Sequence, residues 1–415
     1  MSFLHPPLAA PARVASWVIL IAVMLDMAGF GVSLTILPPL IGRLAGPAQA
    51  GWINGVFVGV WALVQFFTAP LLGALSDRFG RRPMLLVSMA GLGLDYVFMA
   101  LAPNLWWLLL GRLISAATSS SFSICYAYVA DLTTEETRAA AFGRLSAVFG
   151  LGFIFGPAVG GVLGAVSLRA PFWVAAVLSL ANVILGFLAL PESLPEARRL
   201  AKFAWSKANP LGSLRLLRSH PELGRLSWIH LLSQFAGSAI AGVYVLYVAR
   251  RYGWSTELVG LSLALVGAVI AVVQGLLLGR MTGWLGERRT MMVGLACGAL
   301  SLAGFGLAPS GWLIPVAIVL FGLWGLQGPA QAALMSRRVA ASEQGQLQGA
   351  MASLTAIADT LGPLAFGALY SAATRTSASG VTAGAPLLAA SGVLLGALIL
   401  AGVAADGAAG APRSK

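Results

Sequence analysis

Four charged residues interrupt long apolar stretches of the sequence. Asp26 lies near the middle of the first stretch, Asp95 and Arg112 lie in the third and fourth, and Asp359 lies in the eleventh. A charged side chain at the centre of a bilayer costs at least about 2.5 kcal/mol, so such residues are rare and usually serve a proton, ion or substrate pathway. These four side chains are the first candidates for chemistry in this chain.

The types of these residues suggest different tasks. Asp95 and Arg112 lie at a similar predicted depth, so they can form an ion pair, and a purely structural pair and a role in proton coupling are both open at this stage. Loss of water favours the neutral form of a carboxylate unless a nearby cation offsets it. Asp26 is therefore predicted to be the better carrier of protons.

The composition is that of an integral membrane protein. Of 415 residues, 58% are hydrophobic and 10% are charged, against about 25% charged in an ordinary soluble domain. The 50 glycines favour close packing of membrane helices. With three histidines and no HExxH, GxSxG or Walker A motif, the sequence predicts neither an enzyme nor a bound cofactor.

Twelve apolar stretches are long enough to hold these residues in a membrane. A helix needs about 20 residues to cross about 30 Å of hydrocarbon. The sequence therefore predicts an all-α membrane protein with twelve transmembrane helices, over residues 17–40, 52–72, 83–102, 105–129, 141–165, 171–190, 226–249, 258–278, 290–309, 312–335, 347–371 and 383–405.

Basic residues are concentrated in alternate loops between these stretches. Cytoplasmic loops carry an excess of lysine and arginine, so these loops and both termini are predicted to lie in the cytoplasm. Topology and attraction to anionic lipid explain the net charge of +12 better than binding of nucleic acid does. The basic loop residues are those of the stretch 198–225 and Arg78, Arg81, Arg82, Arg138, Arg144, Arg280, Arg288, Arg289, Arg337 and Arg338.

A long polar segment divides the chain near its middle. Residues 191–223 are basic and contain prolines. We interpret them as a cytoplasmic loop between an N-terminal six-helix half, residues 1–190, and a C-terminal six-helix half, residues 224–415.

An internal repeat supports this division. The chain reads GALSDRFGRR from Gly73 and GRMTGWLGERR from Gly279, which is 206 positions later. The glycine-proline pairs at 156–157 and 362–363 are separated by the same 206 positions. Parallel repeated halves with a substrate site at their interface are typical of transporters that work by alternating access.

Several motifs resemble a known family. The chain reads GALSDRFGRRP between the second and third stretches and GLGFIFGPAVGG in the fifth, and both resemble signature motifs of drug/proton antiporters in the major facilitator superfamily. Four further segments resemble one group of this superfamily in particular, the tetracycline/proton antiporters. These segments are LDMAGFGVSLTILP, GLDYVFMALAPNLWWLLLGRLISA, AYVADLTTEETRAAAFG and EQGQLQGAMASLTAIADTLGPLAFGALY. The resemblance covers nearly the whole chain except the termini and the central loop.

The resemblance implies a proton-coupled antiporter that works as a monomer in a bacterial inner membrane. It implies that tetracycline is the exported drug, as a complex with a divalent cation such as magnesium. It also implies that Asp26, Asp95 and Arg112 matter for transport, as they align with charged positions of the tetracycline group. An antiporter for a phenicol, a dye or a metabolite is the alternative, and a proton-coupled nutrient symporter is a further one.

The same motifs imply a gate between the two halves. Asp77 can pair with Arg81 and with the start of a helix in the other half, whereas the glycine-proline motif gives a thin, bent helix that can seal one face. For the motif around Asp77, the alternative is a basic loop that only sets the orientation of the chain in the membrane. For the glycine-proline motif, the alternative is ordinary packing of small residues. The implied gate residues are Asp77, Gly80, Arg81, Asp131, Arg138, Gly156 and Pro157.

Two departures from the family pattern concern carboxylates. The ninth stretch has no aspartate, and Gly298 occupies the matching position, whereas Asp359 replaces a small residue in the eleventh. We hypothesise that Asp359 is the protonatable or cation-recognising group of the C-terminal half, and a solvated or helix-capping role is the alternative. Polar side chains in other stretches are candidates for substrate binding, namely Gln65, Gln274, Gln234, Gln327 and Gln331.

Overall fold

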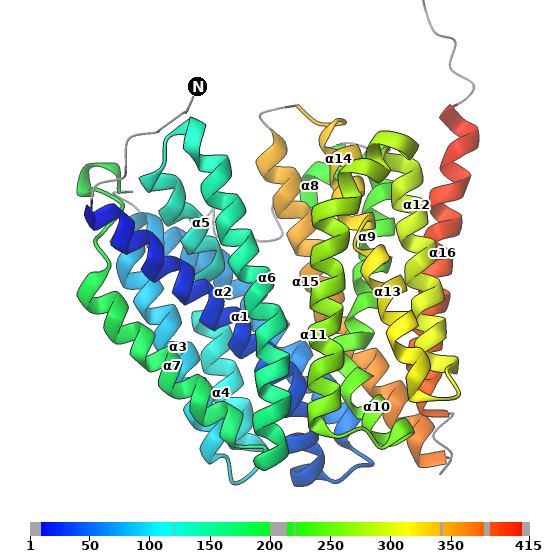
Figure 1. Cartoon of the computed structure of the whole chain (residues 1–415). Coiled ribbons are helices and arrows are strands. Elements are labelled where there is room, and N and C mark those ends of the chain that lie inside the picture. Colours follow the sequence, from blue (N-terminus) through cyan, green and yellow to red (C-terminus); the bar gives the residue numbers. More distant parts are fainter. Residues whose placement is uncertain are drawn as a thin grey trace, which may run out of the picture.

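The computed structural model is a bundle of membrane-length helices arranged in two halves (Figure 1). It describes residues 10–119, 121–199, 214–219, 221–340, 343–376 and 382–408. Within these ranges every regular element is helical, so the prediction of an all-α membrane fold is confirmed. Much of the predicted central loop lies outside the described residues. Its limits at residues 191 and 223, and with them the two domain ranges, stay predictions.

The N-terminal half has six crossings. The fourth is divided into α4 and α5, because the chain leaves helical geometry at Ser119, which has φ −73° and ψ 97°. Its helices are α1 (Ala10–Ala45), α2 (Ala50–Phe79), α3 (Arg81–Leu101), α4 (Leu105–Thr118), α5 (Ser121–Leu132), α6 (Glu135–Val166) and α7 (Ala170–Ala189).

The C-terminal half follows a short 3₁₀ turn, η1 (Glu196–Arg198), and a short helix, α8 (Arg215–Ser219). Two of its crossings contain π-helical turns, η3 (Ile240–Tyr244) and η4 (Val273–Leu277), and η5 (Gly311–Leu313) and η7 (Thr382–Gly384) are 3₁₀ turns. The other helices are α9 (Pro221–Ala239), α10 (Val245–Tyr252), α11 (Thr256–Val272), α12 (Leu278–Leu307), α13 (Ile314–Trp324), α14 (Gln327–Ser336), α15 (Gln344–Thr376) and α16 (Ala385–Ala408).

One continuous helical segment contains two crossings. Thr256–Leu307 has 52 residues and would span about 78 Å if it were straight, which is far more than the bilayer interior. Gly286 lies inside it with φ 74° and ψ 164°, a conformation that glycine adopts readily and that turns the chain. The 11 membrane-length helices of the described residues therefore correspond to the twelve predicted crossings.

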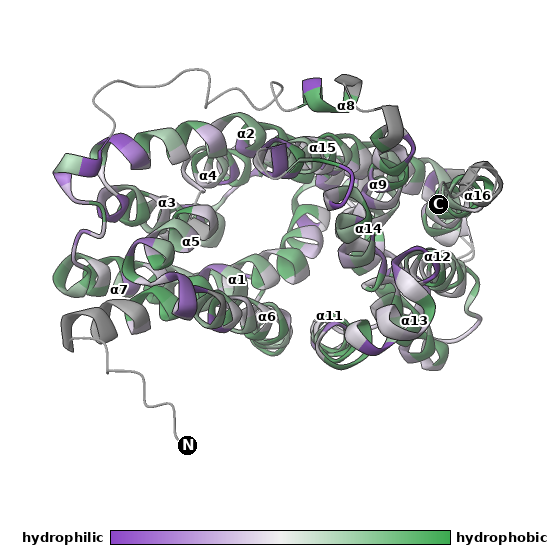
Figure 2. Ribbon diagram, turned by 90° about the horizontal axis from the view of Figure 1, so that it is seen from above, coloured by the Kyte–Doolittle hydropathy of each residue, from purple (hydrophilic) through white to green (hydrophobic). Residues whose placement is uncertain are grey.

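Apolar side chains cover the outside of the bundle as well as its interior. Each half has its own core, around Tyr96 and Phe172 in the N-terminal half and around Tyr244 and Phe305 in the other. Figure 2 shows hydrophobic residues on most ribbons of both halves. Lipid tails are the environment in which such an outer surface is stable, because water would leave a large apolar area exposed.

Candidate functional site

A cavity of about 640 Å³ lies between the two halves. Helices α1 and α2 line it from the N-terminal half, and α9, η3 and α15 line it from the C-terminal half. Its wall is mainly apolar and includes the rings of Phe30, Trp61 and Phe66. Its polar wall includes the side chains of Gln65 and Asp359. A volume of this size is within the range of about 300–1,000 Å³ that is usual for drug-sized ligands.

A second pocket, of about 250 Å³, lies within the N-terminal half next to this cavity. We call it the Asp26 pocket. Phe30, Trp61 and Gln65 line both the pocket and the cavity, so the two spaces adjoin. The polar side chains of the pocket are those of Asp26, Gln65, Ser88, Tyr96, Arg112, Ser115, Ser119 and Ser123. The structure therefore places Asp26 in a pocket with several hydroxyl groups and next to the space where a substrate can bind.

Asp95 and Arg112 form a buried ion pair. Asp95 is fully buried on α3, and Arg112 on α4 is 8% exposed. Arg112 donates Nε to Oδ1 of Asp95 at 3.3 Å and a second hydrogen bond from Nη2 to Oδ2. This two-point geometry matches the fork of a guanidinium to a carboxylate. The pairing expected from the sequence is present, whereas a role of Asp95 in proton coupling stays a prediction.

The two halves are in contact at the end where α2 begins. Asn54 of α2 donates from Nδ2 to the carbonyl oxygen of Gly242 at 2.8 Å, which lies in the π-helical turn η3. The backbone N–H of Trp52 donates to Oγ of Ser371 at 2.9 Å. A π-helical turn leaves carbonyl groups without their usual partners, so Asn54 uses an acceptor that this turn makes available. We call this contact region the α2–α15 seal.

Glycine allows the α2–α15 seal to be close. A Cβ at Gly55 would overlap the carbonyl oxygen of Pro363 on α15. We expect Gly55→Val to shift the equilibrium away from this arrangement, because overpacking costs about 1–3 kcal/mol. Spin labels at positions 48 and 375, in a protein with both cysteines replaced, should report a larger and broader distance.

Gly73 provides a matched control for this prediction. It lies on the same helix, and a Cβ built there meets no described atom within 4 Å beyond its chain neighbours and the adjacent backbone of its own helix. Gly73→Val should leave the distance distribution of the labels unchanged. An unchanged distribution in Gly55→Val would show that the seal does not limit the separation of the halves.

The glycine-proline motif of α6 also makes close contacts. Gly156 packs against the backbone of Ala28 on α1, and the carbonyl oxygen of Pro157 faces Gly260 on α11. Helix α6 therefore touches a helix of its own half and one of the other half through small residues. The structure places Gly156 and Pro157 where a gate could act, and their role in gating stays a prediction.

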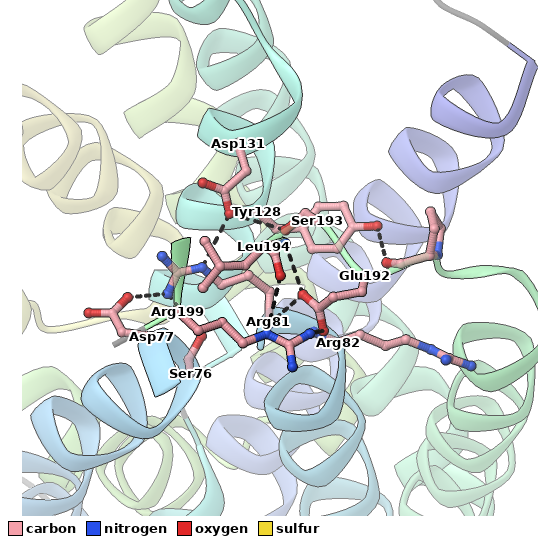
Figure 3. Close-up of polar contacts among 11 residues, drawn as sticks. Ser76, Asp77, Arg81, Arg82, Tyr128, Asp131, Glu192, Ser193, Leu194 and Arg199 are labelled. Carbon is pink, nitrogen blue, oxygen red and sulfur yellow. Dashed lines mark hydrogen bonds and ion pairs between the residues drawn. The ribbon is translucent and has the colours of Figure 1, made fainter. Parts of the chain in front are cut away.

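The predicted gate residues around Arg81 form a cluster at the opposite end of α2 (Figure 3). Arg81 Nη1 lies 2.6 Å from Oδ1 of Asp77, and its Nε lies 3.3 Å from Oδ2 of Asp131 on α5. Gly80 has φ 104°, which places the tight turn where the sequence predicts it. These contacts all lie within the N-terminal half. Arg138 is separate from the cluster and donates to the carbonyl oxygen of Thr133 at 3.5 Å.

Glu192 also belongs to this cluster, although it lies within the predicted central loop, residues 191–223. Its Oε1 accepts hydrogen bonds from the backbone N–H groups of Arg81 at 2.8 Å and of Leu194 at 3.0 Å. Ser193 donates to Oδ2 of Asp131 at 3.1 Å. A carboxylate at the first turn of α3 accepts hydrogen bonds from N–H groups that have no partner within the helix, and its negative charge is stabilised by the positive end of the helix dipole. Glu192 therefore ties the end of the sixth crossing to the start of the third.

The predicted substrate-binding glutamines do not share one space. Gln65 lines the central cavity and the Asp26 pocket. Gln234, Gln274 and Gln327 line a separate pocket of about 280 Å³ inside the C-terminal half. Gln331 is fully buried and accepts a hydrogen bond from Gln327. Of the five, only Gln65 lies beside the carboxylates that the sequence singled out.

A histidine adjoins the central cavity from the C-terminal half. His230 Nε2 lies 2.9 Å from Oγ1 of Thr355, and Thr355 is one helical turn before Asp359 on the cavity wall. The spacing of four residues between Thr355 and Asp359 is visible in the sequence. The contact with His230 joins residues 125 positions apart and has no local sequence signal.

Comparisons with known proteins agree with this architecture. A family model described as the Major Facilitator Superfamily matches residues 19–363. The chain is 39% identical over 359 residues to the tetracycline resistance protein, class C, of Escherichia coli, covering 86% of this chain and 90% of the other. It is 38% identical over 360 residues to the class G protein of Vibrio anguillarum, covering 87% and 91%.

Solved structures share the fold at low sequence identity. A bacterial homologue of the human lysosomal transporter Spinster, in an inward-facing and unoccupied conformation, matches with a TM-score of 0.79 and 17% identity, covering 95% of this chain and 97% of that one. The human organic anion transporter MFSD10 matches with a TM-score of 0.69 and 24% identity, covering 95% and 100%. This chain therefore belongs to the major facilitator superfamily and, within it, to the family of the tetracycline resistance proteins.

Proposed function

We propose that this membrane transporter exports tetracycline from the bacterial cytoplasm in exchange for protons. The observation that carries the proposal is the shared wall of the central cavity and the Asp26 pocket, through Phe30, Trp61 and Gln65. A substrate in the cavity and a proton on Asp26 then act on the same group of side chains. The identity of 39% to a tetracycline resistance protein supports the choice of drug.

The arrangement supports alternating access. The α2–α15 seal closes the end where α2 begins, and the cavity lies between this seal and the Arg-rich end at residues 77–82. With the Arg-rich loops and both termini in the cytoplasm, as the distribution of basic residues predicts, the drug enters from the cytoplasmic side. Protons then reach Asp26 and Asp359 from outside after the seal opens.

Exchange works when the two ligands favour different states. A ligand shifts a conformational equilibrium only through its different affinity for the two states. Protonation removes the charge of a carboxylate and weakens its hold on a cationic group of the drug. Asp26 and Asp359 therefore couple proton entry to drug release, while the Asp95–Arg112 pair holds α3 and α4 together beside the pocket.

A purified sample in proteoliposomes tests the proposal. With an acidic interior and an alkaline exterior, we expect labelled tetracycline to accumulate inside against its gradient, and to leave when the pH gradient is reversed. A nutrient-type symporter would give accumulation with the opposite gradient. Absence of accumulation with either gradient, while a phenicol or a dye accumulates, would favour an antiporter of the same fold for another drug.

Removal of divalent cations tests the form in which the drug is exported. If tetracycline crosses as a magnesium complex, chelation with EDTA should reduce its accumulation, and added Mg²⁺ should restore it. The physical reason is charge, because the metal supplies the positive group that a carboxylate can bind. Equal accumulation with EDTA and with Mg²⁺, at the same pH gradient, would mean that the free drug is the substrate.

A further inference from the structure

Asp359 is the charged group on the described wall of the central cavity. Of the 17 described residues that line this cavity, it is the only one with an ionisable side chain. It is half-buried on α15, and no ion-pair partner is found for it within the described part of the chain. The described wall of the cavity therefore presents a single negative group to whatever occupies it.

The rest of the wall suits an apolar cation. Phe30, Trp61 and Phe66 line the cavity from the N-terminal half, and the ring centroids of Phe30 and Trp61 lie 6.2 Å apart. Aromatic faces attract cations within about 6 Å of the ring. The attraction between a carboxylate and a cation also strengthens where water is excluded. An organic cation that carries apolar groups can use the rings and the carboxylate together.

The charges near the cavity do not remove its preference for a cation. Arg112 is the one cation among the described residues that line the Asp26 pocket, and its guanidinium is bound to Asp95. Asp26 lines the same pocket and adds a further carboxylate. Behind the cavity wall, His230 contacts Thr355. Phe30 and Trp61, which line both spaces, thus separate the cavity that contains Asp359 from the pocket that contains Asp26.

We propose that Asp359 makes the central cavity a binding site for hydrophobic organic cations that contain no metal-chelating group. The proposal extends the class of bound compounds beyond tetracycline. Export of such cations, as distinct from their binding, rests on the proposed function. The site is formed by the carboxylate of Asp359, the rings of Phe30, Trp61 and Phe66, and the hydroxyl of Thr355.

A pair of ions with nearly the same shape tests this site. Tetraphenylphosphonium is a cation and tetraphenylborate an anion, so their affinities for the purified full-length protein in detergent can be compared by equilibrium dialysis at one fixed pH. We expect the cation to bind at least tenfold more tightly than the anion. We also expect Asp359→Asn to weaken binding of the cation by at least about tenfold, because loss of one partner of a desolvated charge pair is costly.

Two further variants control for folding and for net charge. Asp359→Glu keeps the charge and should bind the cation within about threefold of the original protein. Glu196→Gln removes one negative charge from an exposed side chain, 91% accessible, and should not change binding. Equal binding of the cation by Asp359→Asn, or equal binding of both ions by the unaltered protein, would overturn the proposal.

The same preparation separates this proposal from the proposed function. If the unaltered protein accumulates tetracycline with a pH gradient, and Asp359→Asn binds the cation as tightly as the unaltered protein does, only the cation site is refuted. Cation binding that depends on Asp359, in a protein that does not move tetracycline with either pH gradient, would refute only the tetracycline antiport.

Discussion

Replacement of Asp26 by asparagine is expected to abolish proton-driven accumulation of tetracycline. The amide has nearly the same shape as the carboxyl group but does not gain or lose a proton near neutral pH. Asp26 lines the pocket that adjoins the substrate cavity, so this change removes the exchangeable proton without removing the space for the drug. Drug movement should continue only down its own gradient.

The size of the effect follows from the energy of the proton gradient. A proton gradient equivalent to about 100 mV releases about 2.3 kcal/mol per proton, which can sustain a concentration ratio of about 50 for a drug exchanged one for one with protons. In Asp26→Asn this ratio should fall to about one. The accumulation of labelled tetracycline in proteoliposomes with an imposed pH gradient measures the ratio directly.

Exchange without a pH gradient separates a coupling defect from a folding defect. Asp26→Asn should still exchange internal unlabelled drug for external labelled drug, because that process needs alternating access but no net proton transfer. A variant that neither exchanges nor accumulates has lost its structure or its drug site. Uphill accumulation at the original ratio would refute the assignment of Asp26.

The crossings could be predicted from the sequence because they depend on local composition. A run of about 20 apolar residues predicts a membrane helix wherever it occurs, and the positive φ of Gly80 follows from a short turn between two such runs. Contacts between distant residues give no such signal. Asn54 meets the π-helical turn at Gly242, which is 188 positions away, and nothing near either residue indicates the pairing.

The candidate site was predictable in part for the same reason. Asp26 and Asp359 stand out because each interrupts an apolar stretch, and charged residues in membranes usually have a function. Glu192 does not interrupt such a stretch, since it follows the sixth crossing in a polar segment. Its role at the start of α3 depends on hydrogen bonds to residues 110 and 111 positions earlier, which only the folded chain brings together.

Replacement of Arg112 by glutamine is expected to destabilise the protein more than any other single change discussed above. The carboxylate of Asp95 is fully buried and receives two hydrogen bonds from Arg112. Removal of one partner from a buried ion pair costs about 3–5 kcal/mol, since the remaining charge has neither water nor a counterion. Equilibrium unfolding in mixed micelles, followed by tryptophan fluorescence, should show a loss of this size.

The double variant Asp95→Asn with Arg112→Gln tests this explanation. Two neutral amides of similar volume leave no buried charge, so the double variant should recover most of the stability that Arg112→Gln loses, and a double-mutant cycle gives the coupling energy. No recovery would mean that packing of the long Arg112 side chain, and not the charge of Asp95, holds α3 against α4. If the double variant is stable but no longer accumulates tetracycline, Asp95 or Arg112 also takes part in proton coupling, as the resemblance to tetracycline/proton antiporters implies.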